Sequence, residues 1–263
     1  MTIWNGLWKK EWHMMRGWFY GTLLGSVAIS FILPLLLTYF FEWKFTQLDM
    51  ELHFIPLIWM VFTVFIPLSI AVTSINMELE RPDVWLHTPA SIFQLFGVKV
   101  VYAITVGLLN MTVTTILFLF YLRLTDGLSQ VLSISELLAF VVHFLLMLSF
   151  ITWIIVIVGL FFRIIHLLFK QLFGSSAIII VIILFIAFMA AIDWITKTAL
   201  YTKISTIGSL QNVPNRELLL GNGESSLFVG GEFFYVGELF MTYSFMGLLF
   251  IATALLFEKK VRL

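Results

Sequence analysis

Two ionisable residues lie at a spacing that could support chemistry inside a membrane. Glu136 and His143 are seven residues apart in an apolar stretch, so a helix places them on one face. Ionisable groups at membrane depth are functional candidates by default. Glu136 is at the outer edge of the stretch, where a carboxylate stays hydrated, and a lone histidine is more often a hydrogen-bonded packing residue. An intramembrane enzyme is therefore one hypothesis for this chain.

The common catalytic motifs are missing from the sequence. It has no H-E-x-x-H pair for a metalloprotease and no cysteine for a thiolate nucleophile or a Cys metal site. Ser175 and Ser176 follow Gly174 without a matched base. No G-x-x-x-x-G-K-[ST] occurs, so the chain cannot hold ATP in a P-loop. We assign no catalytic residue and no metal site.

A polar stretch, ELERPDVWLHTPASIFQLFGVK at residues 78–99, interrupts the apolar sequence. Pro82 is expected to end the preceding helix because it lacks a backbone donor, and Thr88 with Pro89 is typical of the next helix start. The turn between them should expose apolar residues bordered by charge, which marks either a partner surface or contact with lipid headgroups. The residues concerned are Glu80, Arg81, Asp83, Val84, Trp85, Leu86, His87 and Pro89.

The elements around this stretch are membrane helices. Charged residues make up 11% of the 263 residues and apolar residues 61%, against roughly a quarter and a half in soluble domains. The apolar windows lack the alternation of barrel strands, which indicates an all-α integral membrane protein. No domain boundary interrupts residues 1–263. We predict six transmembrane helices, at 18–41, 52–76, 96–121, 137–161, 175–195 and 234–257.

The basic residues predict the orientation. With both termini in the cytoplasm, ten of the 15 Lys and Arg residues lie inside, as the positive-inside rule favours. These ten are Lys9, Lys10, Arg16, Arg81, Lys99, Arg163, Lys170, Lys259, Lys260 and Arg262. Residues 196–233 then form the one long extracytoplasmic loop, in which we expect short helices and a turn at Pro214–Asn215. No basic patch indicates nucleic-acid binding.

Residues 3–19 have an amphipathic pattern of their own. Tryptophans gather on one side of the helical wheel and bases on the other, and Glu11 alone falls on the wrong side. The pattern favours an elbow helix at about residues 1–17 that lies in the cytoplasmic interface and leads into the first span. The alternative is a plain helical extension of that span.

Polar residues within and between the spans have two interpretations each. Gly21 and Gly25 form a GxxxG, and a stripe at a spacing of four serves either helix packing or a transport path. Its members are Thr22, Ser26, Ser30, Pro34 and Thr38. In the second inner loop, 162–174, the bases Arg163, His166 and Lys170 are either a lesser partner contact or positive-inside anchors.

The stretch 78–99 resembles the loop between the second and third helices of permease subunits of the ABC-2 type, bacterial exporters whose ATPase is usually a separate chain. The resemblance rests on a charged exit from the second helix, a Leu-x-x-Pro element, and a Gly and a Lys early in the third helix. Here these are Glu80, Arg81, Leu86, Pro89, Gly97 and Lys99, and Pro82–Asp83 replaces the common Gly-Thr. The elbow, the six spans and the enlarged last loop match the same layout.

The resemblance implies a function for the loop at 77–95. Residues 83–88 would be a coupling helix seated in an ATPase subunit, with Trp85 and Leu86 as anchors and Glu80, Arg81 and Asp83 at the rim. Two ATPase copies would supply ATP and Mg, and this chain would bind no cofactor. A second permease chain, identical or similar, would complete a transport route in the bacterial cytoplasmic membrane. The cargo class would be a hydrophobic or amphipathic molecule such as a peptide, an antibiotic or a lipid. Besides the enzyme, the other hypotheses are a channel and an accessory immunity or sensory protein.

Overall fold

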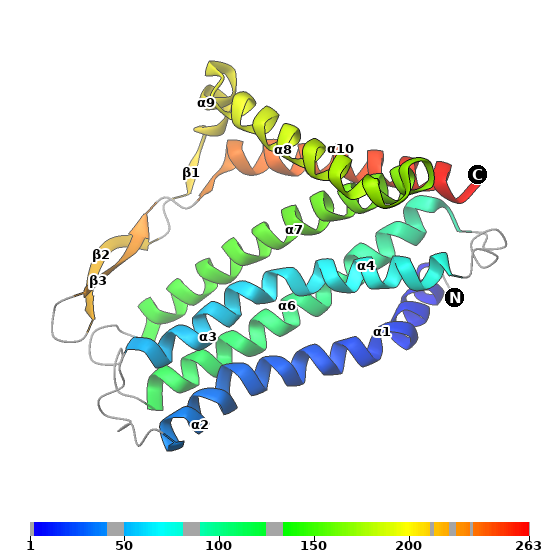
Figure 1. Cartoon of the computed structure of the whole chain (residues 1–263). Helices are drawn as coiled ribbons and strands as arrows, with labels where there is room; N and C mark the ends of the chain where they lie inside the picture. The colour runs from blue at the N-terminus through cyan, green and yellow to red at the C-terminus, as the bar shows by residue number, and fades with distance from the viewer. Residues whose placement is uncertain are drawn as a thin grey trace.

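A computed structural model describes residues 3–40, 50–80, 90–124, 134–210, 213–220, 225–231 and 234–262. The chain is nearly all helical, as predicted, and the helices lie side by side in an elongated bundle (Figure 1). The helical segments of the bundle, including the short π and 3-10 turns, are α1 (Ile3–Val27), η1 (Ala28–Ile32), α2 (Leu33–Phe40), α3 (Met50–Phe62), η3 (Thr63–Phe65), α4 (Ile66–Leu79), α6 (Ile92–Leu124), α7 (Ile134–Phe173), η4 (Gly174–Ser176), α8 (Ala177–Thr196) and α10 (Val236–Arg262).

Five stretches of the described residues are long and apolar enough to cross a membrane, which indicates a multi-pass membrane protein. They are Ile3–Leu37, Ile55–Leu79, Ile92–Phe120, Val142–Thr196 and Val236–Lys259. The fourth contains both α7 and α8, which fold back on each other at Gly174, where φ is 57° (Figure 1). Six crossings require α7 and α8 to span separately, and that number stays a prediction.

The segment predicted as an elbow belongs to the first long helix. From Ile3 onward, residues 1–17 form the beginning of α1, which runs to Val27 and bends near its N-terminal end (Figure 1). Both the elbow and the plain helical extension of the first span stay predictions. Met15 and Glu11 are buried against the rest of the bundle, so the segment packs on protein along part of its length. Its position in the membrane interface stays a prediction.

Two prolines explain where the first two spans depart from α-helix. A proline removes the backbone donor to the carbonyl four residues earlier. Pro34 follows the π-helical segment η1, and Pro67 follows the 3-10 segment η3, so each irregular turn contains the carbonyl that loses its partner. Pro56 lies inside α3, which continues past it.

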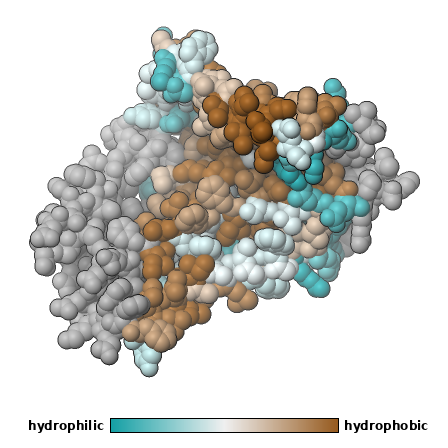
Figure 2. Space-filling model, viewed as in Figure 1, coloured by the Kyte–Doolittle hydropathy of each residue, from teal (hydrophilic) through white to brown (hydrophobic). Residues whose placement is uncertain are grey.

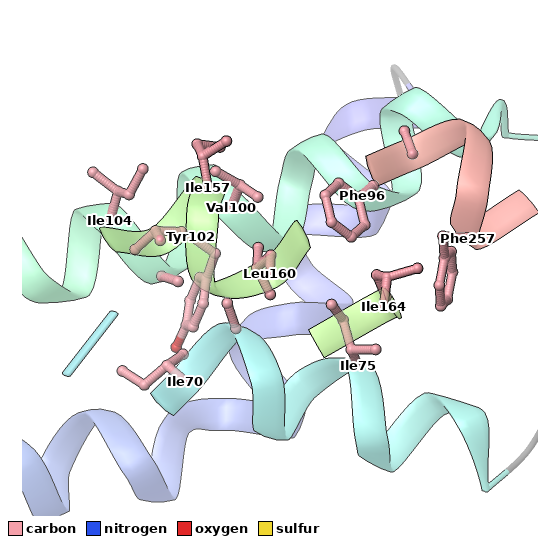
Figure 3. Close-up of a cluster of buried hydrophobic side chains, with 14 of the residues drawn as sticks. Ile70, Ile75, Phe96, Val100, Tyr102, Ile104, Ile157, Leu160, Ile164 and Phe257 are labelled. Carbon is pink, nitrogen blue, oxygen red and sulfur yellow. The ribbon is translucent and has the colours of Figure 1, made fainter. Parts of the chain in front are cut away.

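The core lies between α4, α6, α7 and α10, with part of α1 against it (Figure 3). Phe96 is fully buried, and its ring centroid is 5.5 Å from that of Phe250 and 6.0 Å from that of Phe257. Small residues set the spacing of these helices. A Cβ at Gly107 of α6 would lie 2.1 Å from Pro67 Cγ, and a Cβ at Gly159 of α7 would lie 2.6 Å from Leu68 Cδ1. The first turn of α4 therefore fits between two glycines.

The segment after α8 differs from the prediction of short helices alone. One short helix, α9 (Ala199–Ser205), is followed by two antiparallel strand pairs, β1 (Ser209–Leu210) with β4 (Phe234–Tyr235) and β2 (Val213–Leu220) with β3 (Ser225–Gly231). Pro214 and Asn215 lie within β2, so the predicted turn there is wrong. The register shifts between Val213 and Arg216, where a proline cannot donate to the ladder.

The two termini lie at the same end of the molecule, which we call the terminal end (Figure 1). The C-terminal end of α4, the start of α6 and the α7–α8 turn also lie there (Figure 1). Hydrophilic residues gather at this end and around α9, whereas apolar residues cover α8 and α2 (Figure 2). The cytoplasmic location of this end stays a prediction.

Candidate functional site

The predicted partner-binding loop falls largely outside the described residues. Glu80 is described and caps the C-terminal end of α4, with its N–H near Asn76 O. The other predicted contact residues, Arg81, Asp83, Val84, Trp85, Leu86, His87 and Pro89, lie outside the described part of the chain. The structure therefore describes α4 and α6, the two helices that flank the loop.

The start of α6 is later than the sequence interpretation placed it. Ala90 and Ser91 are not helical, and α6 begins at Ile92. Gln94 N donates to Ser91 Oγ at 3.3 Å, and Ser91 N donates to Gln94 Oε1 at 3.1 Å. This reciprocal pair is a capping box, whose S-x-x-Q pattern was present in the sequence. The prediction of a helix that starts at Thr88 and Pro89 is thus wrong for Ala90 and Ser91, which are not helical.

A buried group of charges lies close to both ends of the loop. Lys99 Nζ of α6 is 2.5 Å from Glu11 Oε1 of α1 and 3.0 Å from Glu78 Oε2 of α4. It also donates to Ser74 Oγ at 2.6 Å, and Ser74 Oγ donates to Glu11 Oε2 at 2.7 Å. Lys10 Nζ is 2.6 Å from Glu78 Oε1. We call these five residues the Lys99 cluster.

The Lys99 cluster is closed to solvent except at one residue. The side chains of Lys99, Glu11 and Glu78 are 1%, 4% and 5% exposed, whereas Lys10 is 36% exposed. Two carboxylates and two ammonium groups balance, which offsets part of the cost of taking four charges out of water. Loss of one partner would leave an uncompensated charge inside the bundle.

The cluster connects three helices around the loop. Glu78 is the penultimate residue of α4, and Lys99 is two helical turns into α6. Glu11 adds α1 to the same contact, and two aromatic side chains of α1 support it. The Trp8 and Tyr102 ring centroids are 5.4 Å apart, and a Cβ at Gly97 would lie 3.8 Å from the Trp4 ring. Gly97 and Lys99, the third-helix residues of the resemblance, therefore both contact α1.

The bases predicted on the second inner loop lie at the end of a long helix instead. Arg163, His166 and Lys170 belong to α7, which continues to Phe173. Arg163 Nη2 donates to Asn76 Oδ1 of α4 at 2.7 Å, and Arg163 Nη1 is 3.1 Å from His166 Nδ1. These contacts bring Arg163 and His166 together next to α4. Lys170 is exposed.

The stripe of hydroxyls on the first span packs largely against α6. Ser26 Oγ donates to Asn110 Oδ1 at 3.1 Å, and Asn110 Nδ2 donates to Thr22 Oγ1 at 3.2 Å. Ser30 is buried, and its hydroxyl has no hydrogen-bond partner among the described residues. Thr38 lies in α2, with its side chain outside the description. Thr22 and Ser26 thus serve helix packing in the single chain.

The GxxxG of the first span is on a different face. A Cβ at Gly21 or Gly25 would meet nothing within 4 Å, so no described residue uses their small size. This face borders two adjoining grooves of about 220 and 420 Å³ between α1 and the α3–α4 segment. The grooves are lined mainly by Gly17, Trp18, Gly21, Thr22, Gly25, Trp59, Phe62, Phe65, Ile66 and Ser69.

The residues behind the enzyme hypothesis both lie on α7. His143 is half-buried within the helix, and Glu136 is close to its start, with its side chain outside the description. Within the described ranges, no group of three His, Asp or Glu side chains is arranged to hold a metal ion. Comparisons with protein-family models, with curated proteins and with solved structures found no match to this chain.

The Lys99 cluster is the feature that sequence reasoning missed. Glu11 and Lys99 are 88 residues apart, so no local pattern connects them. One signal was present: Glu11 is the single charged residue on the tryptophan side of the 3–19 helix. A charge on an otherwise apolar face needs a buried partner, and Lys99, in an apolar window, needs one too.

Proposed function

We propose that this chain is the membrane-spanning permease subunit of an ATP-driven exporter of the ABC-2 type. A separate ATPase subunit, present in two copies, would bind ATP and Mg and contact residues 80–89. A second permease chain would complete the transport route. The cargo class is a hydrophobic or amphipathic molecule, such as a peptide, an antibiotic or a lipid, and the membrane is the bacterial cytoplasmic membrane.

The observation that carries the proposal is the Lys99 cluster. A motor that pushes on a loop can move a membrane bundle only if the loop is firmly attached to the helices. Here Glu78 and Lys99 join the two helices that flank residues 81–89, and Glu11 adds α1. A displacement of the loop would therefore move α1, α4 and α6 together, as a rigid-body mechanism requires.

The resemblance supplies the second support. Its third-helix residues, Gly97 and Lys99, are used in the contacts with α1. Both termini and both flanking helix ends lie at the terminal end of the bundle, where a soluble ATPase would reach them if that end is cytoplasmic (Figure 1). The missing P-loop motif fits a transporter whose ATPase is a different protein.

Co-purification tests the proposal. The tagged chain is extracted in mild detergent from the membranes that naturally contain it, and P-loop proteins in the eluate are quantified by mass spectrometry together with ATP hydrolysis. We expect a stoichiometric ATPase with the unaltered chain and at least a tenfold loss with Trp85→Ala or Leu86→Asp. Trp194→Ala is the matched control, because Trp194 is 71% exposed at the far end of α8. Absence of any ATPase with the unaltered chain, or full retention by both loop variants, would overturn the proposal.

A further inference from the structure

Three basic side chains form a strip near the C-terminal end of α7. Arg163, His166 and Lys170 are three and four residues apart, which places them within about 60° of one another on the helix surface. Arg163 is half-buried, His166 is half-buried and Lys170 is exposed, so the strip runs from the bundle to the surface. We call these residues the α7 strip.

The hydrogen bonds fix the chemistry of the α7 strip. Arginine has only donors, so Nδ1 of His166 accepts from Arg163 Nη1 at 3.1 Å. His166 then carries its proton on Nε2 and presents an N–H there. Asn76 Oδ1 accepts from Arg163 Nη2, which holds the guanidinium beside α4. The strip thus offers guanidinium, imidazole and ammonium donors in a row.

The positive charge of the α7 strip is not neutralised within the described part of the chain. No described carboxylate forms an ion pair with Arg163 or Lys170 there, and Arg163 Nε is buried without a hydrogen-bond partner. The two carboxylates of the Lys99 cluster already face Lys99 and Lys10. The partner that Arg163 has on α4 is a neutral amide. An external anion is what would complete this charge balance.

The surroundings of the α7 strip indicate which anion. The α7–α8 turn exposes Leu172 and Phe173, and α8 exposes Ile178 and Ile179 directly after it. Apolar residues continue along α8 (Figure 2). A ligand with an anionic head and apolar tails matches a basic strip that lies next to an apolar surface. Basic groups at a helix end bind headgroups, and the adjoining apolar surface contacts acyl chains.

We propose that the α7 strip binds the phosphate headgroup of an anionic phospholipid. The lipid would bridge Arg163, His166 and Lys170 through its phosphate oxygens and lay its tails against α8. This inference does not depend on an ATPase partner, so it can fail or hold separately from the proposed function. It also gives the three bases a role other than contact with a protein.

Native mass spectrometry of the full chain in detergent tests the site. The probes are phosphatidylglycerol, phosphatidylcholine and inorganic phosphate, added in separate titrations. We expect one phosphatidylglycerol to bind at least tenfold more tightly than phosphatidylcholine. Lys170→Gln should weaken it about fivefold, and Arg163→Gln with Lys170→Gln about 25-fold, at ~1 kcal/mol per base. Lys197→Gln is the matched control, because Lys197 is at the opposite end of α8 and paired with Asp193.

The variants separate the possible outcomes. Lys170 is exposed and forms no hydrogen bond or ion pair with the described residues, so Lys170→Gln tests binding without disturbing the fold even if removal of Arg163 does. Equal phosphatidylglycerol affinity for the unaltered chain and Lys170→Gln would overturn the proposal. Displacement of the lipid by millimolar inorganic phosphate would replace it with a free-phosphate site. Loss of a co-purifying protein, with unchanged lipid binding, would assign the strip to a protein contact instead.

Discussion

The ammonium of Lys99 lies 2.5 Å from Glu11 Oε1, and both side chains are shielded from solvent. The first residue is early in α6 and the second is in α1, so a single ion pair joins elements that are distant along the chain. The pair forms part of a charge-balanced group with Glu78, Lys10 and Ser74. The contribution of this group to the stability of the bundle can be measured by removing its charges one at a time.

Lys99→Met should strongly destabilise the protein. It leaves two carboxylates against Lys10, and breaking a buried pair costs about 3–5 kcal/mol. Adding Glu11→Gln leaves Glu78 and Lys10 as a balanced pair, so the double variant should recover part of the loss. Thermal unfolding in detergent, followed by tryptophan fluorescence, measures both effects. The control is Lys197→Met, which removes an exposed pair worth about 0.3–0.5 kcal/mol. Equal effects of Lys99→Met and Lys197→Met would contradict the expectation.

Gly107→Ala should lower stability because its new methyl group meets Pro67 Cγ at 2.1 Å. The clash is with a rigid ring, and overpacking of this kind typically costs about 1–3 kcal/mol. Gly25→Ala is the matched control, because its methyl group meets nothing within 4 Å and should leave stability unchanged or slightly raised. The midpoint of thermal unfolding is compared between the two variants. A Gly107→Ala protein that is more stable than the unaltered chain would contradict the close approach of Gly107 to Pro67.

Asn110→Ala should loosen α1 from α6. It removes the bonds to Thr22 and Ser26, and interhelical hydrogen bonds in membranes are worth about 0.6–2 kcal/mol. Thr112→Ala is the comparison, since the exposed Thr112 hydroxyl bonds only to its own helix at Leu108 O. Hydrogen exchange of the α1 amides reports the difference. Unchanged α1 protection in the Asn110 variant would show that the stripe does not rely on this amide.

Ser91→Ala should fray the start of α6. The substitution removes the hydroxyl that accepts from Gln94 N, and loss of an N-cap costs about 0.5–2 kcal/mol. Ser91→Asp retains an acceptor and should restore the helix start. Hydrogen exchange at Gln94 and Leu95 is the measurement, with Ser69→Ala as a control at a serine whose hydroxyl bonds to Phe65 O one turn earlier rather than capping a helix start. Equal exchange in the Ala and Asp variants would exclude a capping role.

The helices were predictable from the sequence, but the contacts between them were not. Apolar windows located each long helix, because lipid leaves the backbone no other way to satisfy its polar groups. The window at 137–161 underestimated α7, which continues to Phe173, since Arg163, His166 and Lys170 reduce hydropathy without ending a helix. The β2–β3 pair was missed because Pro214–Asn215 is typical of a turn, and only pairing with the next strand overrides that local preference.

In the candidate site, too, the local features were predictable from the sequence and the contacts between helices were not. The loop at residues 77–95 was predicted from its own residues, because charge, proline and tryptophan in an apolar chain are visible locally, and its contact residues other than Glu80 lie outside the described part of the chain. The Lys99 cluster depends on three helices meeting, and only the misplaced Glu11 hinted at it. The capping box at Ser91 was readable but was outweighed by the Thr-Pro pair before it.

The π-helical turn η1 separates the first span into two parts, α1 and α2, that differ in their contacts. Before it, Glu11, Thr22 and Ser26 hold α1 to its neighbours. At Ala28–Ile32 the winding widens, and beyond it α2 exposes Tyr39 and Phe40. Single π-helical turns of this kind occur frequently at functional sites. The part of the span that these polar contacts hold to its neighbours therefore ends at η1, and the aromatic side chains beyond it face outward.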